Sequence, residues 1–168
     1  MTTYASSIDT PVGSLTAIVD ESGALTHLLF THQPAPGDAV WDAQRCAPVA
    51  VQVREYFAGE RTDFDVPLAP AGSPFQQQVW RELRGVGFGE TAGYGELAAR
   101  LGRVGSARAV GRANATNPIP IVIPCHRVLG SDGCLTGYAG GMEMKMALLR
   151  LEGIAIRDGR MPRISRAA

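Results

Sequence analysis

The sequence predicts an α+β protein in two parts, an antiparallel sheet with one helix followed by a helical part. Short segments with strand-like alternation and tight turns fill the first thirty residues. Apolar residues at helical spacing dominate after the break "AGSP" at residues 71–74. Net charge also changes there: residues 1–73 carry 3 basic and 9 acidic residues, a net −6, and residues 74–168 carry 13 basic and 7 acidic residues, a net +6. We therefore expect domains at 1–73 and 74–168.

The elements expected in the first part form a meander followed by a helix. Strands are predicted at residues 4–9, 13–20 and 23–30, because each segment alternates and is bounded by Pro or Gly. A helix is predicted at residues 47–57, where Val49, Val53, Tyr56 and Phe57 share one face and Gly59 follows. Residues 62–68, "TDFDVPL", are expected to be extended.

The elements expected in the second part are helices. The first begins at Pro74, with Ser73 as N-cap and Gln76 able to close a capping box. Two short helices at residues 94–101 and 106–115 are joined by a tight turn at 102–105, which in a basic segment indicates a helix-turn-helix. A last helix is predicted at residues 142–151 with Met144, Leu148 and Leu151 inward, followed by a flexible tail at 157–168.

The second helix of the pair is unusually thin, because small residues alternate along "ARAVGRANA". Two interpretations stay open. A helix without bulk suits the DNA minor groove, which is only about 6 Å wide. Small residues suit a close helix–helix contact equally well. The basic charge of this part favours a polyanionic partner such as nucleic acid.

Composition bounds the remaining possibilities. No segment has the length of an apolar membrane span, and the N-terminus lacks a signal-peptide pattern, so we expect a cytoplasmic protein with no membrane partner. The three cysteines, Cys46, Cys125 and Cys134, fit neither a disulfide framework nor a zinc motif. We therefore expect no metal and no cofactor.

The segment "IPCHRV" places Cys125 and His126 side by side. Cys125 is either a small buried hydrophobe or an activated nucleophile. Adjacent residues of an extended segment point apart, so a water between the thiol and the imidazole is the easier geometry. Glu152 lies at the end of the last helix, where the dipole disfavours a carboxylate unless a cation pairs with it. These residues can form a Cys–water–His–Glu relay.

Several motifs together resemble one family. "FGETAGYGELA", "ARAVGRA", "NPIPIVIPCHRV", "GYAGG" and "LLRLEG" occur in the order found in O6-alkylguanine-DNA alkyltransferases. The resemblance is specific from Phe75 to Gly153. The first 73 residues are compatible with the family's RNase H-like domain. The resemblance thus implies an RNase H-like domain with an antiparallel sheet and an all-α, winged helix-turn-helix domain.

The family's activity implies a role for each matching residue. The chain would transfer the alkyl group of O6-alkylguanine in duplex DNA irreversibly to its own cysteine after base flipping, with O4-alkylthymine as a second candidate substrate. The catalytic set would be Cys125, His126, Glu152, Asn117 and Tyr94. The base pocket would comprise Tyr94, Val128, Tyr138, Ala139 and Gly140. The DNA-binding set would be Ser106, Ala107, Arg108, Arg112, Asn114, Ala115 and Arg127.

Specific roles within these sets also follow from the resemblance. Arg108 would enter the duplex in place of the flipped base, and Tyr94 would protonate the leaving guanine. Ala139 stands where some members carry serine, so one hydroxyl contact is missing. Two other functions stay open, a winged-helix DNA-binding regulator with a structural cysteine and a cysteine hydrolase. The free protein is expected to be a monomer.

Overall fold

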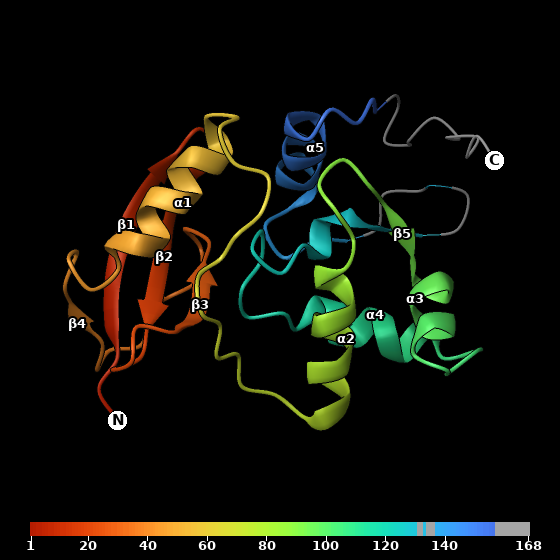
Figure 1. Cartoon of the computed structure of the whole chain (residues 1–168), viewed down its shortest axis with the longest axis horizontal. Helices are drawn as coiled ribbons and strands as arrows, with labels where there is room; N and C mark the ends of the chain where they lie inside the picture. Colours follow the sequence, from red (N-terminus) through yellow and green to blue (C-terminus); the bar gives the residue numbers. More distant parts are fainter. Residues whose placement is uncertain (131–132, 134–136, 157–168) are drawn as a thin grey trace. The chain divides into compact units, whose positions relative to one another are not determined.

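The computed structural model describes residues 1–130, 133 and 137–156, which belong to two units (Figure 1). Unit 1 contains Met1–Ser73 and Pro118–Val122, and unit 2 contains Pro74–Asn117 and the chain from Ile123 onward. The sequence places residues 118–122 in the second domain, but their contacts belong to unit 1. The amide of Leu28, for example, donates to the carbonyl of Pro118 at 2.9 Å. The expected tail at 157–168 and Cys134 lie outside the described residues.

Unit 1 is built on a four-stranded sheet in the order β3-β2-β1-β4. The strands β1 (Tyr4–Thr10), β2 (Gly13–Val19) and β3 (Leu25–Leu29) form the predicted antiparallel meander. Gly13 and Gly23 take positive φ angles of 115° and 86° at the turns, which only glycine adopts without strain. A further strand, β4 (Val40–Trp41), pairs parallel with β1. Two residues give no periodic pattern, so the sequence did not predict β4.

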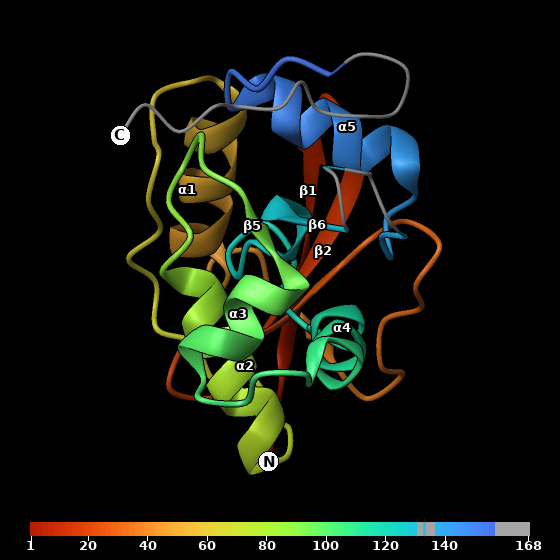
Figure 2. The same ribbon diagram turned by 90° about the vertical axis from the view of Figure 1, so that its right-hand side faces the viewer.

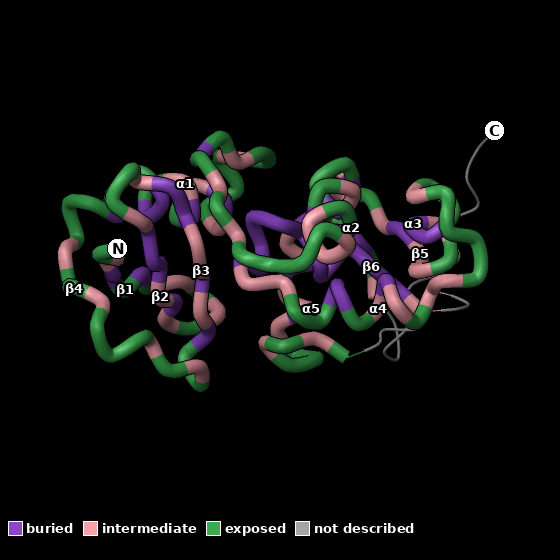
Figure 3. The backbone as a smooth tube through the Cα atoms, turned by 90° about the horizontal axis from the view of Figure 1, so that it is seen from below, coloured by how far each residue is buried: buried purple, intermediate pink, exposed green. Residues whose placement is uncertain are grey.

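Helix α1 (Ala47–Phe57) covers one face of this sheet, where it contacts β1 (Figure 1). It has the predicted bounds because Pro at its first turn needs no N–H partner and Gly59 follows at φ 77°. The side chains that it buries are Val49, Ala50, Val53 and Tyr56. Figure 3 shows buried residues along β1 and β2, whereas most of the loop leading to β4 is exposed. Residues 62–68 form no strand and contribute one bridge, Leu25 to Leu68.

Unit 2 contains α2 (Pro74–Arg84), α3 (Tyr94–Arg100), α4 (Ala107–Ala115) and α5 (Met142–Leu151). Helices α2, α3 and α4 contact one another (Figure 2). The indole N–H of Trp80 in α2 donates to the carbonyl of Ala113 in α4 at 2.9 Å. Gly102 and Gly105 take φ angles of 69° and 88° in the turn between α3 and α4. The helix-turn-helix predicted from the sequence is present.

The resemblance led us to expect an all-α second unit, but this unit also contains two short strands. Strands β5 (Ala92–Gly93) and β6 (Val128–Leu129) form a parallel pair, in which Ala92 lies opposite Val128 and Gly93 opposite Leu129. A 3₁₀ turn, η1 (Cys125–Arg127), comes directly before β6. The pair therefore places the Cys-His segment beside the start of α3. No helix in the described ranges is long and apolar enough to cross a membrane.

Candidate active site and nucleic-acid surface

Two three-residue turns shape the chain before Cys125. The amide of Val122 donates to the carbonyl of Pro120 at 2.9 Å, around Ile121 at φ 74°. The amide of Cys125 donates to the carbonyl of Ile123 at 2.7 Å, around Pro124. Such turns fix the backbone tightly, and a β-branched residue at positive φ is strained. The thiol is therefore carried by a backbone that local bonds already hold.

The Cys125 side chain is buried, and polar groups surround it. Burial raises the pKa of its thiol to about 11, although hydrogen bonding with Asn117, the charge of Lys145 and hydrogen bonding with Tyr138 act to lower it. A thiolate is the reactive form of cysteine. The thiol form therefore predominates at neutral pH unless a neighbouring group takes the proton.

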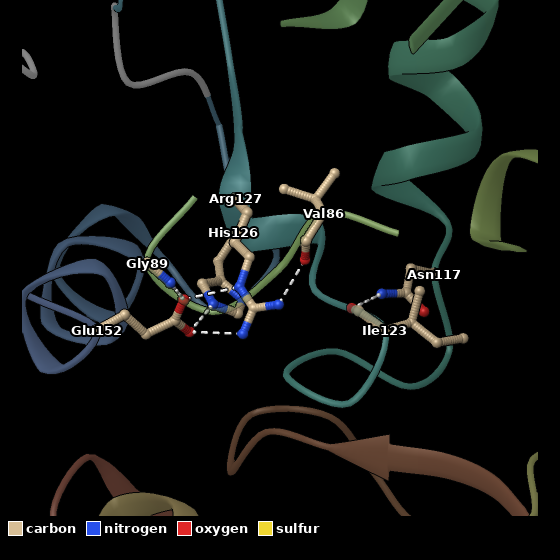
Figure 4. A network of polar contacts seen from close by, with 7 residues as sticks. All are labelled: Val86, Gly89, Asn117, Ile123, His126, Arg127 and Glu152. Carbon is tan, nitrogen blue, oxygen red and sulfur yellow. Dashed lines mark hydrogen bonds and ion pairs between the residues drawn. The ribbon is translucent and has the colours of Figure 1, made fainter. Parts of the chain in front are cut away.

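Asn117 connects the end of α4 to the segment that carries Cys125. Its side-chain amide donates to the carbonyl of Ile123 at 2.8 Å (Figure 4). The same carbonyl accepts the amide of Cys125, so one oxygen joins the side chain of Asn117 and the backbone of Cys125. A displacement of either partner strains this shared bond.

His126 and Glu152 form a pair whose side chains are both fully buried. The Nε2 of His126 lies 2.6 Å from Oε2 of Glu152 (Figure 4). Because an ionised carboxylate can only accept, Nε2 carries the hydrogen and Nδ1 keeps a free lone pair. Nδ1 is buried and has no hydrogen-bond partner in the described part of the chain. Burial lowers the pKa of His126, against the opposing effect of Glu152.

Glu152 is the C-cap of α5, where the helix dipole alone would disfavour a carboxylate. Donors from three directions offset that cost. The carboxylate accepts from His126, from both Nε and Nη2 of Arg127 at 2.7 and 3.2 Å, and from the amide of Gly89 at 3.4 Å. Burial raises the pKa of Glu152, but the bonds and charges of His126 and Arg127 outweigh it and hold the pKa at about 2. The carboxylate is therefore ionised at neutral pH.

The burial of Arg127 contradicts one prediction. The resemblance had placed this residue among the DNA-binding residues. Its side chain is only 7% exposed, and its guanidinium is used inside the unit. Besides Glu152, it donates from Nη1 to the carbonyl of Val86 at 2.7 Å and lies 6.0 Å from the centre of the Phe88 ring. A guanidinium with these partners does not face a DNA phosphate.

Lys145 is a functional candidate that the sequence analysis missed. It is fully buried, and its Nζ donates to the carbonyl of Val128 at 2.8 Å. Burial lowers the pKa of Lys145 to about 8, while Cys125 acts to raise it. The helical spacing of the last helix could have revealed that Lys145 is buried. The buried face of α5 and its C-cap is Lys145, Leu148, Leu149 and Glu152, at i, i+3, i+4 and i+7, whereas the predicted Met144 and Leu151 are half-buried.

The residues predicted to form the base pocket are brought together only in part. Tyr138 acts to lower the pKa of Cys125, and Val128 is buried directly after η1. Tyr94 follows β5, which pairs with β6, so Tyr94 starts α3 next to the strand that carries Val128. Ala139 is exposed and Gly140 half-buried.

The predicted DNA-binding residues of α4 and its N-cap fall on two faces. Arg108, Arg112 and Ala115 are exposed, and Ser106 and Ala107 are half-buried. Asn114, by contrast, is 6% exposed, and its Oδ1 has no partner among the residues that the structure describes. The prediction of Asn114 as a surface contact is therefore wrong. The reason is helical geometry, since Asn114 lies on the inward side with Val110 and Ala113.

The structure supports the helix-packing explanation of the thin helix. Gly111 faces the ring of Tyr94, since a Cβ at this position would lie 3.7 Å from two ring carbons. Ala113 is buried beneath Trp80. These two positions are small because helices pack there. Ala107 and Ala109 are half-buried and Ala115 is exposed, so small residues also lie outside the packed face, beside Arg108 and Arg112.

No group of three or more His, Cys, Asp or Glu side chains in the described ranges is arranged to hold a metal ion. The polar groups that converge on Cys125 are instead those of a nucleophile with an acceptor and cations nearby. Such a site can carry out nucleophilic substitution by sulfur.

The chain resembles known proteins over both of its units. Residues 3–70 match the family "6-O-methylguanine DNA methyltransferase, ribonuclease-like domain", and residues 74–154 match "6-O-methylguanine DNA methyltransferase, DNA binding domain". A methylated-DNA–protein-cysteine methyltransferase of Mycolicibacterium paratuberculosis is 46% identical over 86% of this chain and 89% of the relative. That of Shigella flexneri is 45% identical over 87% and 93%.

Solved structures show the same likeness. The crystal structure of Mycobacterium tuberculosis OGT in complex with DNA superposes with a TM-score of 0.84 at 46% identity, covering 89% of this chain and 92% of the other. The O6-methylguanine methyltransferase of the same organism covers 96% of both chains with a TM-score of 0.83 at 43% identity.

Proposed function

Because the chain belongs to the 6-O-methylguanine DNA methyltransferase family, we propose that it repairs duplex DNA by moving the alkyl group of O6-alkylguanine to its own Cys125. The observation that carries this proposal is the set of polar groups around the Cys125 thiol. Asn117, Lys145 and Tyr138 all act on Cys125, and the buried His126–Glu152 pair follows in the next turn of chain. A merely structural cysteine does not need polar groups around it.

The proposed reaction is a substitution at the alkyl carbon. Cys125 sulfur forms a bond to the carbon as the carbon–O6 bond breaks, and the bonding electron pair leaves with guanine. The thiol proton passes through a water to Nδ1 of His126, which has a lone pair to accept it. Tyr94 donates a proton to the departing guanine. Glu152 stabilises the imidazolium that forms. The product is a thioether, which no group in the site can cleave, so each molecule reacts once.

Access to the alkylated base requires that it leaves the stack, which costs a few kcal/mol. We assign this step to α3 and α4. Arg108 is exposed on the thin outward side of α4 and fills the space of the flipped nucleotide. Arg112 contacts the phosphate backbone. Ser106 and Ala107 approach the backbone at the start of the helix, where its N–H groups favour phosphate. Val128, Tyr138, Ala139 and Gly140 receive the base.

The alternative of a non-catalytic regulator lacks support. The relatives that cover most of this chain are named methyltransferases, and the crystallised relative with DNA covers both units. A cysteine hydrolase would require turnover, which a stable thioether prevents. We propose that the protein is a monomer when free. We place it in the cytoplasm, because the reaction requires a reduced thiol and reducing compartments maintain one.

The test uses a duplex with O6-methylguanine inside a restriction site that the lesion blocks. Wild-type protein should restore cleavage of no more than one duplex per protein molecule. Cys125→Ser should restore none while still retarding the duplex on a gel, since binding comes from α4 and its arginines. Repair by the serine variant would exclude Cys125 as the acceptor. Loss of both repair and binding would indicate a folding defect, which thermal unfolding of the variant would show.

A further inference from the structure

We propose that Arg127 is a positioning residue for the transfer to Cys125: it holds the Glu152 carboxylate in the orientation that fixes His126, and its charge offsets that of Glu152. The inference rests on the proposed alkyl transfer. It assigns to the reaction a side chain that the family resemblance had placed among the DNA contacts. Arg127 acts through Glu152 and His126 and does not touch the thiol.

The first support is the fork geometry. Nε and Nη2 of Arg127 reach the two oxygens of Glu152 at 2.7 and 3.2 Å (Figure 4). A two-point contact of this kind fixes the plane of the carboxylate, which a single bond cannot. Oε2, the oxygen that binds Nη2, is also the one that binds His126 at 2.6 Å. The ring of His126 is therefore oriented by a carboxylate that Arg127 orients.

The second support is an anchor for the guanidinium itself. Nη1 donates to the carbonyl of Val86 at 2.7 Å, in the loop between α2 and β5. The same loop returns to the site at Gly89, whose amide donates to Glu152 and whose φ is 77°. A Cβ at Gly89 would lie 3.4 Å from the Glu152 carbonyl, so the loop approaches closely. Arg127 and Glu152 are thus both bound to one loop, which keeps the fork from rotating.

The third support is electrostatic. The charged or titratable groups that act on His126 are Glu152, Arg127 and Lys145, with Cys125 beside it in sequence. Glu152 raises the pKa of His126, and Arg127 and Lys145 lower it. Arg127 offsets part of the carboxylate's effect on His126, and the two groups are in contact. Removing its charge makes every proton-binding group nearby hold its proton more tightly.

Lysine cannot replace Arg127 fully. A lysine ammonium is a point charge on a flexible stem and does not present three N–H groups in one plane. Arg127→Lys should therefore keep the charge and lose the orientation. Arg127→Met loses both and keeps much of the apolar stem. The two variants separate the two parts of the proposal.

The experiment measures the rate of Cys125 alkylation by a free benzylated guanine base as a function of pH. This substrate removes duplex binding from the readout. Arg127→Met should shift the acid limb of the profile to higher pH by about one unit and slow the reaction. Arg127→Lys should slow the reaction with a smaller shift. The control is Arg150→Met, which removes an exposed positive charge from α5, the helix that Glu152 caps, and should leave the profile unchanged.

Each result decides the matter. An unshifted acid limb in a folded Arg127→Met protein overturns the proposal. A normal rate of alkylation by the free base, together with weaker binding of the same variant to duplex DNA, also overturns it and would make Arg127 a DNA contact. If Arg127→Met does not fold, Arg127→Lys carries the test, and a wild-type rate for it overturns the orienting role. Failure of the wild-type protein to be alkylated by methylated duplex would instead contradict the proposed function itself.

Discussion

Lys145 and Cys125 show how burial sets the chemistry of single residues. Burial raises the pKa of the thiol and lowers that of the ammonium, and each of these groups opposes the shift of the other. The thiolate and the ammonium therefore stabilise each other in a site whose burial disfavours both charged forms. This pair, with the lone pair of His126, supplies the two requirements of an activated cysteine, a positive field and a proton acceptor.

The residue-scale prediction is that Lys145→Met slows alkylation of Cys125 about tenfold at pH 7, because loss of the ammonium raises the pKa of the thiol and each unit of increase lowers the thiolate fraction about tenfold. The pKa of Lys145 is about 8, so its charge in the wild-type protein is lost as pH rises through that value. The difference between wild type and variant should therefore narrow above pH 8. The measurement is the rate with a free benzylated guanine base.

The control for Lys145→Met is a change of another charge on α5. Glu143→Gln changes an exposed charge on the same helix and should leave the rate unchanged. A Lys145→Met protein that unfolds with a normal transition and reacts at the wild-type rate at pH 7 would show that the ammonium does not act on the thiol.

The sequence indicated part of the site and missed the part that depends on tertiary packing. Cys125, His126 and Glu152 could be singled out because their types and their place in the chain suggest a relay. Arg127 could not be assigned correctly, because a basic side chain in a basic domain is expected at the surface. Lys145 was missed for the same reason, although its spacing from Leu148 and Leu149 marks it as part of the buried face of α5. Only the packed structure shows that the Val86 and Val128 carbonyls and Glu152 receive these two cations.

At the scale of elements, α4 combines two demands on one short helix. Its inward side must admit Tyr94 and Trp80, and its outward side presents Arg108 and Arg112. Helix bounds were predictable here because turn glycines and the N-cap Ser106 mark them in the sequence. The strands β5 and β6 were not predictable. Two residues each are too short to show alternation, and their pairing depends on contacts across 36 positions of chain.

The element-scale prediction concerns Gly111→Ala in α4. Alanine in a helix interior is favoured over glycine by roughly 0.5–1 kcal/mol. The new Cβ would meet the ring of Tyr94 at 3.7 Å, an ordinary contact. The variant should therefore raise the free energy of unfolding of unit 2 by about that amount. Urea titration followed by Trp80 fluorescence measures it, in a Trp41→Phe background that removes the other tryptophan, which is 62% exposed in unit 1.

A lower free energy of unfolding for Gly111→Ala would contradict the packing described for α4, because it would mean that the ring of Tyr94 lies closer to this helix. Ala109→Gly is the matched comparison on the same helix. It should lower the free energy of unfolding by a similar amount, since it removes a Cβ from another helical position.

At the scale of the whole molecule, charge is divided between the two parts of the chain. The acidic first part and the basic second part were visible in the sequence, and so was the helix-turn-helix that uses the basic charge. The sequence also indicated the family. It did not show that residues 118–122 join unit 1, which requires contacts such as that between Leu28 and Pro118.

The prediction at this scale concerns acid stability. The pKa of Glu152 is about 2 in the folded protein and ordinarily 4.5, so its stabilising effect is present above pH 4.5 and is lost as pH falls toward 2. The pKa of His126 is lowered from 6.5, so below that value the unfolded chain binds a proton that the folded one does not. The free energy of unfolding should therefore fall below pH 6.5 and fall faster below 4.5.

Urea titrations between pH 7 and 3 measure this dependence, again through Trp80. Glu152→Gln should have a lower free energy of unfolding than the wild type at pH 7. Below pH 4.5 its free energy of unfolding should fall less than that of the wild type, by on the order of 2–3 kcal/mol. Asp9→Asn, which alters a carboxylate in unit 1, should leave the decline measured in unit 2 unchanged. Equal declines for wild type and Glu152→Gln would contradict the ionised, buried state of Glu152.

The most direct test of the central claim is the mass of the protein after reaction with duplex DNA that contains O6-methylguanine. We predict that each molecule gains the mass of one methyl group, that excess DNA adds no second one, and that peptide mapping places the methyl on Cys125 and not on Cys46 or Cys134. A protein that keeps its original mass while the lesion disappears, or one methylated at another residue, would contradict the account.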